Sequence, residues 1–460
     1  MRRVRNSLEI ETKAFVSQTR QGWPWWNGWI SPRSTSAEHS ALTIPVCGST
    51  SFLSRITSMP QVAGAFRTLR SRKFAVIGLP PIFIGLLGYM IWPRPDSARL
   101  LQLAWMECEA ARFDRAQSLL DRRAKLSSAT ALDWLLRSRI AKGRGKVEQA
   151  LEALRQVSDD DPLAGEVNLQ IGRIELDRDR ARVAEDAMLH ALSLDPARTM
   201  AHRELAYVYA IQHRRTDCSA QFRALNMRLP VDAKLAFVWT QNDCSLWDPK
   251  ETRDRLERFV EADPNDRRSR LALAESLLAL HLPDEAEDVL SPLSTADPET
   301  VALRSRSALD RNDFDSATTL AERASLGHPA LSTIRGRLAM SRQDFGEAAR
   351  LFREAIRADP DDRHAIQGLS RALQAMGDAA GAAPLLETVR KRDRLRSLVI
   401  DSKTNLGKDP KVFLKLARAT EDTGALIQAI AWYRLAITLD PLDSEAQRGL
   451  SRVSLIADDE

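Results

Sequence analysis

The sequence predicts an all-α fold, a solenoid of repeated helix pairs that follows a single transmembrane helix. A run of nineteen residues without a charge, at positions 74–92, predicts the transmembrane helix. The solenoid is predicted by prolines that recur every 34 residues, each just before a new helical pattern. They are Pro162, Pro196, Pro230, Pro264 and Pro298. A fixed period of this length is typical of chains whose units bury their apolar faces only against one another.

Charge is concentrated before the uncharged run. Residues 1–73 hold eleven of the 67 Lys and Arg but only three of the 62 acidic residues, a net charge of +8. The rest of the chain therefore carries −3, although the whole chain is at +5. Nucleic-acid binding needs a basic face on the folded domain, so we expect no nucleic-acid partner.

The run at 74–92 would form a helix of about 28 Å, close to the hydrocarbon thickness of a bilayer. Arg67, Arg70, Arg72 and Lys73 stand directly before it, and a weaker positive cluster follows. The positive-inside rule then places the N-terminus in the cytoplasm and the repeats on the far side. We expect a single-pass protein of a bacterial cytoplasmic (inner) membrane, with extracytoplasmic repeats.

A cleaved signal peptide and a buried core helix are the alternatives for residues 74–92. The first lacks a cleavage site of small residues, and the second lacks an amphipathic face. Pro80-Pro81 is the departure from an ordinary membrane helix. Residues 1–73 read as a basic, disordered leader, and Met59 is a candidate for the true start of translation.

Small side chains recur in register with the prolines, and a bulky apolar residue follows four positions later in nearly every unit. Side chains four apart share one face of a helix, so the small residue permits close approach and the bulky one fills the groove. Ala321 is the one undersized bulky position. The small positions are Ala116, Ala150, Ala184, Cys218, Thr252, Ala286, Ala317, Ala348, Ala382 and Ala429.

This pattern resembles the tetratricopeptide repeat (TPR). The signature of its first helix is present piecemeal, as in Ile171-Gly172, Leu205-Ala206 and Leu273-Ala274. The resemblance implies a right-handed superhelix of helix-turn-helix repeats, with the first helices lining a concave groove that binds other proteins.

The period divides residues 97–443 into ten units, with a capping helix at 444–456. The units are 97–130, 131–164, 165–198, 199–232, 233–266, 267–297, 298–328, 329–362, 363–396 and 410–443. An insertion at 397–409 interrupts the period, as either a short helix or a surface loop. Unit 233–266 has Thr240 and Thr252 in place of its small residues, and we expect a local bend there.

A small residue followed by arginine recurs at the concave position of the first helices. These arginines would project guanidinium groups suited to carboxylate or phosphate along one groove. The alternative is that they are solvated arginines paired with neighbouring acids. The seven candidate partner-binding residues are Arg139, Arg173, Arg306, Arg337, Arg371, Arg418 and Arg452.

No catalytic motif is present, the seven histidines are dispersed, and the four cysteines lack zinc-site spacing. We therefore expect no enzyme, metal or cofactor. Cys218 reads as a small core residue, and a Cys218–Cys244 disulfide is left open. The predicted function is a membrane-tethered scaffold whose groove binds an acidic protein or peptide. The alternative is an accessory or assembly subunit of a membrane-bound enzyme or secretion complex.

Overall fold

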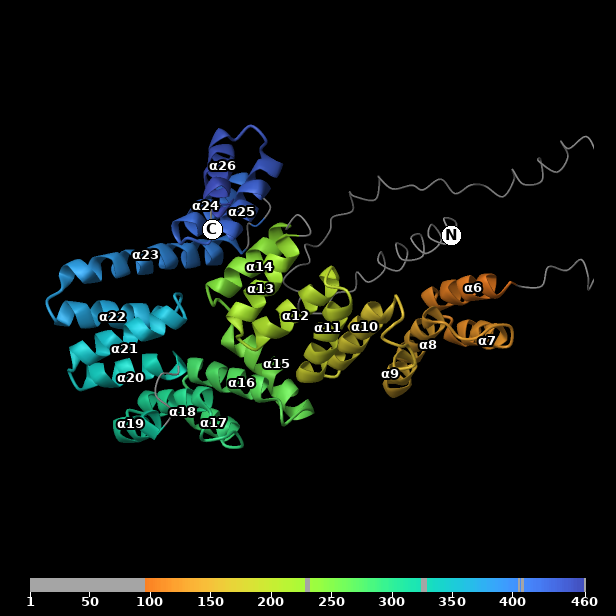
Figure 1. The fold of residues 1–460 in the computed structure, drawn as a ribbon, viewed down its shortest axis with the longest axis horizontal. Helices are drawn as coiled ribbons and strands as arrows, with labels where there is room; N and C mark the ends of the chain where they lie inside the picture. Colours follow the sequence, from red (N-terminus) through yellow and green to blue (C-terminus); the bar gives the residue numbers. More distant parts are fainter. Residues whose placement is uncertain (1–95, 228–231, 324–328, 404–405, 407–408, 459–460) are drawn as a thin grey trace, which may run out of the picture. The chain divides into compact units, whose positions relative to one another are not determined.

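The computed structural model describes residues 96–227, 232–323, 329–403, 406 and 409–458, all within one compact unit. In this part of the chain every regular element is a helix, 21 in all, and they form an α-solenoid (Figure 1). The predicted all-α solenoid is confirmed. The predicted leader and membrane span lie outside the described residues, among which no helix is long and apolar enough to cross a bilayer.

Ten pairs of consecutive helices and one final helix make up the solenoid. The first five pairs are α6 (Ser97–Glu109) with α7 (Phe113–Ala124), α8 (Ala131–Gly143) with α9 (Val147–Leu154), α10 (Ala164–Asp177) with α11 (Ala181–Leu194), α12 (Thr199–Ile211) with α13 (Arg215–Asn226), and α14 (Ala233–Asp243) with α15 (Pro249–Ala262). The others are α16 (Arg267–Ala279) with α17 (Pro283–Leu290), α18 (Pro298–Asp310) with α19 (Phe314–Arg323), α20 (Pro329–Ser341) with α21 (Phe345–Ala358), α22 (Arg363–Ala375) with α23 (Ala379–Ser402), and α24 (Pro410–Asp422) with α25 (Leu426–Leu439). The chain continues into α26 (Ser444–Asp458).

Each pair turns through one residue in the left-handed backbone region. Such a residue ends a helix because its amide can reach back to a free carbonyl of the last turn. Seven of these residues are not glycine. The ten are Ala111, Gly145, Asp179, His213, Ser245, His281, Asn312, Gln343, Gly377 and Gly424.

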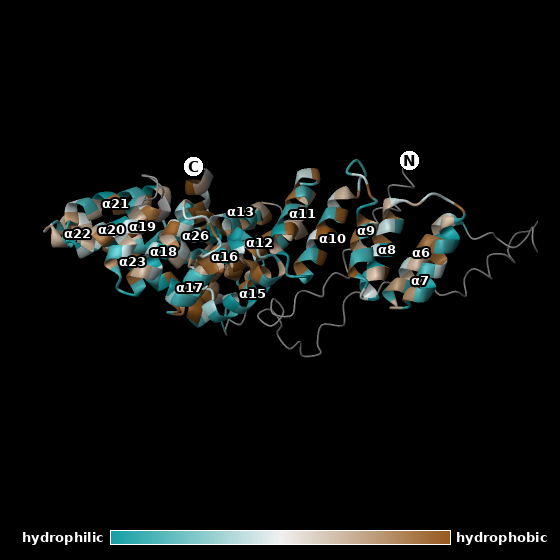
Figure 2. Cartoon of the chain, turned by 90° about the horizontal axis from the view of Figure 1, so that it is seen from below, coloured by the Kyte–Doolittle hydropathy of each residue, from teal (hydrophilic) through white to brown (hydrophobic). Residues whose placement is uncertain are grey.

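The repeat positions form the seam between paired helices. All ten small second-helix residues are buried, and so is the undersized Ala321. Gly172 shows why the slot on the first helix must be small: a Cβ there would lie 2.8 Å from Met188 Cγ and 3.1 Å from the Ala184 carbonyl oxygen. Most helices carry both hydrophobic and hydrophilic residues, as amphipathic helices of a stack do (Figure 2).

The insertion predicted at 397–409 begins as helix. Residues 397–402 continue α23, which reaches Ser402. Asp409 caps α24, where its carboxylate accepts from the Lys411 amide at 2.9 Å. The departure from the period is thus a longer second helix followed by a short connection.

The pair α14–α15 departs most from the repeat. α14 packs against α13, α25 and α23, whereas α15 packs against α16 and α12. The bend expected in unit 233–266 is therefore an opened helix pair. Figure 1 shows the consequence, since α23 and the α24–α26 group lie beside α14 although they are far from it in sequence.

Candidate binding cavity

The opened pair gives α14 a new partner at the C-terminal end of the solenoid. Thr240 occupies the small-residue slot on α14, and its Oγ1 accepts a hydrogen bond from Trp432 Nε1 at 2.9 Å. Both residues are fully buried, although 192 positions separate them. Trp239 packs on the other side, stacked on Phe222 of α13 with ring centroids 5.9 Å apart.

Two further hydrogen bonds join α14 to the C-terminal elements. The Gln428 side-chain amide on α25 donates to the Asp243 carboxylate, and the Arg396 guanidinium on α23 donates to the Cys244 carbonyl oxygen. Together with the Trp432–Thr240 bond these contacts close the solenoid on itself. We call this set of six residues the clasp.

A cavity of about 1460 Å³ lies inside the closed part. Its wall is formed by the turn between α12 and α13, the end of α14, the inner faces of α16, α18, α20 and α22, the second half of α23, and the turn between α24 and α25. Small-molecule pockets are typically about 300–1,000 Å³, so this space is large enough for a segment of polypeptide.

Arginines from three consecutive first helices line one side of the cavity. Arg306, Arg337 and Arg371 come from α18, α20 and α22, and all three belong to the predicted set. Arg306 and Arg337 share Asp310, each with a nitrogen 3.9 Å from its carboxylate. The Arg371 side chain makes no hydrogen bond or ion pair within the described residues. We call these three residues the arginine wall.

The pKa of His364 depends on the charges near this wall. Burial lowers its pKa, and the charges of Arg306, Arg337 and Arg363 lower it further, against the opposing effect of Asp362. A neighbouring positive charge disfavours protonation of imidazole, so these arginines act in the same direction as burial. The charge of Arg306 also lowers the pKa of Glu275, another residue that lines the cavity.

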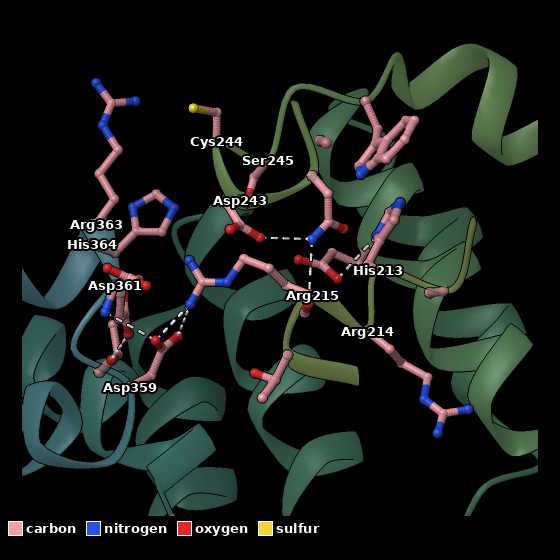
Figure 3. A pocket seen from close by; sticks show the side chains of 18 of the residues that line it. His213, Arg214, Arg215, Asp243, Cys244, Ser245, Asp359, Asp361, Arg363 and His364 are labelled. Atoms are coloured by element: carbon pink, nitrogen blue, oxygen red, sulfur yellow. Dashed lines mark hydrogen bonds and ion pairs between the residues drawn. The ribbon is translucent and has the colours of Figure 1, made fainter. Parts of the chain in front are cut away.

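Some of the other charges that line the cavity are paired with each other. Arg215 reaches across to Asp359, with Nη2 at 2.5 and 2.7 Å from the two carboxylate oxygens (Figure 3). The Arg392 guanidinium donates to the Asp361 carboxylate. These pairs brace the cavity, whereas Arg371 has no such pair within the described residues.

The turn between α12 and α13 reaches α16 directly, because α14 does not stand between them. Gln212 Nε2 donates to Ser269 Oγ at 3.0 Å, and His213 Nδ1 lies 3.1 Å from Glu275 Oε2. Burial acts to raise the pKa of Glu275, but the hydrogen bond and charge of His213 outweigh it, so this pKa is lowered. The left-handed conformation of His213 at the turn aims its ring toward α16.

Glu275, His213 and Ser276 lie in a row, with the histidine between the carboxylate and the hydroxyl, as in the triad of a hydrolase. His213 Nε2 lies 3.4 Å from Ser276 Oγ, which also lies 3.3 Å from Thr252 Oγ1. Ser276 is completely buried in the seam between α15 and α16. A nucleophile must reach its substrate, so this arrangement supports the joint between units and offers no site for acyl transfer.

The other four predicted arginines do not line the cavity. Arg139 lies over the Trp105 ring, 5.7 Å from its centroid. Arg173 pairs with Glu204 at 2.8 Å, Arg452 pairs with Glu421 at 2.6 Å, and Arg418 contacts Glu445. The structure thus brings together three of the seven residues and places the other four against neighbouring side chains.

The three cysteines that the structure describes, Cys108, Cys218 and Cys244, are free and buried. The disulfide left open from the sequence is therefore not formed here. Cys218 is fully buried in its repeat slot, where its thiol donates to the Ala206 carbonyl at 3.3 Å. Across the described residues no cluster of His, Cys, Asp or Glu could hold a metal ion.

Sequence reasoning missed the clasp. One signal was available, since α25 reads LIQAIAWYRLAITL and is apolar on nearly every side. A helix that is apolar all round is buried on more than one face. The sequence alone does not identify what covers the second face, which is α14.

Tetratricopeptide-repeat family models match three segments of the chain, residues 135–198 and 303–363 with one model and 339–406 with another. Nothing among the curated proteins matches the sequence. Among solved structures, a tetratricopeptide repeat protein from Parabacteroides merdae is 15% identical, with 53% of this chain and 98% of that chain covered and a TM-score of 0.29.

Two other solved structures show the same level of similarity. The Pseudomonas aeruginosa pilF protein is 17% identical over 45% of this chain and 97% of that chain, with a TM-score of 0.25. The Cut9–Hcn1 hetero-tetramer of APC/C is 13% identical over 80% of this chain and 79% of that chain, with a TM-score of 0.33.

Proposed function

Because this chain is a tetratricopeptide repeat protein, we propose that it is a membrane-tethered scaffold that binds an acidic segment of a partner protein in its cavity. The repeats are of a kind that generally binds proteins, and the cavity has room for a polypeptide segment. The arginine wall supports the acidic character of the partner. The tether rests on the uncharged run at 74–92 and the basic residues before it.

The arginine wall is the observation that carries the proposal. Three guanidinium groups project from successive first helices, and the carboxylate of Asp310 contacts two of them only at 3.9 Å. A carboxylate can bind a guanidinium through two parallel hydrogen bonds, which are stronger than neutral ones. Aspartate or glutamate side chains of a partner would pair with these guanidinium groups in that way.

Binding of a labelled oligoglutamate to the full-length protein in detergent tests this site. Fluorescence anisotropy should show binding that weakens roughly ten-fold in each of the variants Arg337→Gln and Arg371→Gln, because each loses a charge-assisted contact. Arg418→Gln is the matched control, since Arg418 is on a first helix but contacts Glu445 outside the cavity.

Three results would contradict the site. They are equal affinity in wild type and both wall variants, equal loss in the Arg418→Gln control, and binding of oligoglutamine as tight as that of oligoglutamate. A single-stranded oligonucleotide that binds in place of oligoglutamate would assign the wall to phosphate instead.

The tether has its own test. Protease added to intact spheroplasts should digest the repeats, and the protein should remain in the membrane fraction after carbonate washing. Protected repeats would contradict the orientation, and release by carbonate would contradict the tether. A stoichiometric enzyme complex recovered from detergent-solubilised membranes would favour an accessory subunit over a general scaffold.

A further inference from the structure

The clasp joins α14 to helices that are far from it in the sequence. The contacts of the clasp also differ in chemistry from those of the repeat seams. The seams are built from small and bulky apolar side chains. The clasp instead depends on three hydrogen bonds, from Trp432, Gln428 and Arg396. We propose that the clasp is a reversible closure, which opens to admit the partner segment to the cavity and closes around it.

Both sides of the clasp retain their own packing when it opens. On one side Trp432 lies against Phe413 of α24, with ring centroids 5.6 Å apart. On the other side Trp239 stays stacked on Phe222. Each side of the clasp therefore keeps its own aromatic pair. Opening exposes the surfaces that were in contact but removes no side chain from the core on either side.

One group that separates is a carboxylate, which gains water in return. Asp243 accepts hydrogen bonds from Ser219, Asn242 and Gln428. Burial raises its pKa, which shows that its charged form is disfavoured in the closed state. Opening would hydrate this carboxylate and offset part of the lost contact.

Opening of the clasp would widen the route into the cavity. The clasp residues Asp243, Cys244, Arg396 and Gln428 also line the cavity, so the closing contact is part of its wall. A partner segment in the middle of a folded chain has no free end to thread. Opening the wall at the clasp admits such a segment from the side. That the clasp admits a partner segment rests on the proposed function, whereas the opening of the clasp does not.

Cys244 is a native reporter of clasp opening. Its thiol is buried at the contact, 9% exposed, and burial raises its pKa to about 12. Cys218 is 0% exposed and Cys108 is 4% exposed, and both lie in helix-pair seams. Cys108 is on α6 at the far end of the described chain, and Cys218 precedes Ser219, which donates to Asp243. Since the thiolate is the reactive form, all three should resist alkylation until the structure around each one opens.

The experiment is a timed N-ethylmaleimide labelling of the full-length protein in detergent, read site by site by mass spectrometry. We expect Cys244 to react faster than Cys218 and Cys108 under native conditions. Gln428→Ala and Trp432→Phe each remove one clasp hydrogen bond and should accelerate Cys244 roughly five-fold, with the rate at Cys218 unchanged. Arg434→Ala, an exposed position on the same helix, should leave all three rates as in wild type.

Two outcomes would overturn the proposal. If Cys244 reacts at the same rate as Cys218, the contact opens only when the whole solenoid unfolds. If Gln428→Ala and Trp432→Phe retain the wild-type Cys244 rate while circular dichroism shows unchanged helix, the thiol is reached without clasp opening. No ligand is present in this assay, so its failure is distinct from failure of the acidic-segment proposal.

Discussion

Two units of this solenoid meet the same packing problem with different slot residues. In unit 165–198, Gly172 lets α10 approach α11 so closely that Met188 and a backbone carbonyl lie where a Cβ would be. In unit 233–266 the equivalent slot holds Thr240, and α14 leaves α15 to pack elsewhere. The closed pair has glycine at this position, and the open pair has threonine.

When a helix pair is opened, the face that its partner helix no longer covers must be buried by another helix. The α14 face that α15 does not cover is buried by α25, where Trp432 donates to Thr240. Arg139 and Arg173, before the joint, lie against neighbouring side chains, whereas Arg306, Arg337 and Arg371 line the cavity after it. Arg418 and Arg452 also follow the joint, but they pair with Glu445 and Glu421.

Trp432→Ala should have the largest effect on this comparison. It empties a fully buried site between α14 and α24, and substitutions of this kind cost about 3–5 kcal/mol. Trp134→Ala, in the regular half, is the matched control because that side chain is only partly buried. Urea unfolding followed by circular dichroism should show the larger loss for Trp432→Ala, and equal losses would mean that the closure adds no stability.

Asp133→Asn should have the next largest effect, in the regular half. Arg123 Nε and Nη2 donate to Asp133 at 2.6 and 3.0 Å, and both residues are buried. Removing the carboxylate leaves a buried guanidinium unpaired except for Ser97 and Ser127, which should cost on the order of 3 kcal/mol at pH 7.

The acid dependence of Asp133 follows from the same pair. Burial acts to raise its pKa, but hydrogen bonds from Arg123 and Thr130 outweigh it and hold the pKa below its ordinary value. Its stabilising contribution is therefore present above about pH 4 and is lost as the pH falls through the lowered pKa. Urea unfolding at acid pH should show a shallower decline in Asp133→Asn than in wild type, and parallel declines would contradict this assignment.

Gly172→Val should destabilise the regular unit by about 1–3 kcal/mol, because the added side chain meets Met188 and the Ala184 carbonyl. Gly346→Ala is the control, since the nearest atom to its Cβ is 3.9 Å away. That substitution should stabilise by at most about 1 kcal/mol through helix propensity. Differential scanning calorimetry separates the two, and opposite signs are expected.

Asp243→Asn should have the smallest effect and the opposite pH dependence to Asp133→Asn. Burial raises the pKa of Asp243, so its neutral form favours the fold. Its contribution is present below about pH 4 and is lost as the pH rises through the raised pKa. Asparagine removes that titration and should change stability at pH 7 by under about 1 kcal/mol. If the stability of the variant changed with pH as that of the wild type does, the raised pKa of Asp243 would be contradicted.

Much of the fold could be predicted because its signals are local. Helix ends and seams depend on residues within about 34 positions of one another, and the ten small residues from Ala116 to Ala429 are all buried. The arginine positions were also identifiable from register. Their separation into a cavity wall and neighbour-bound side chains was not, because it depends on where the solenoid closes.

The sequence by itself determined that this protein is a stack of helix pairs, because small and bulky residues in a fixed period can be buried only by stacking. The tertiary structure decided that Thr240 meets Trp432 and that three arginines share one cavity. Contacts across 192 residues depend on small rotations that accumulate from unit to unit, and the local spacing of residues does not specify their sum.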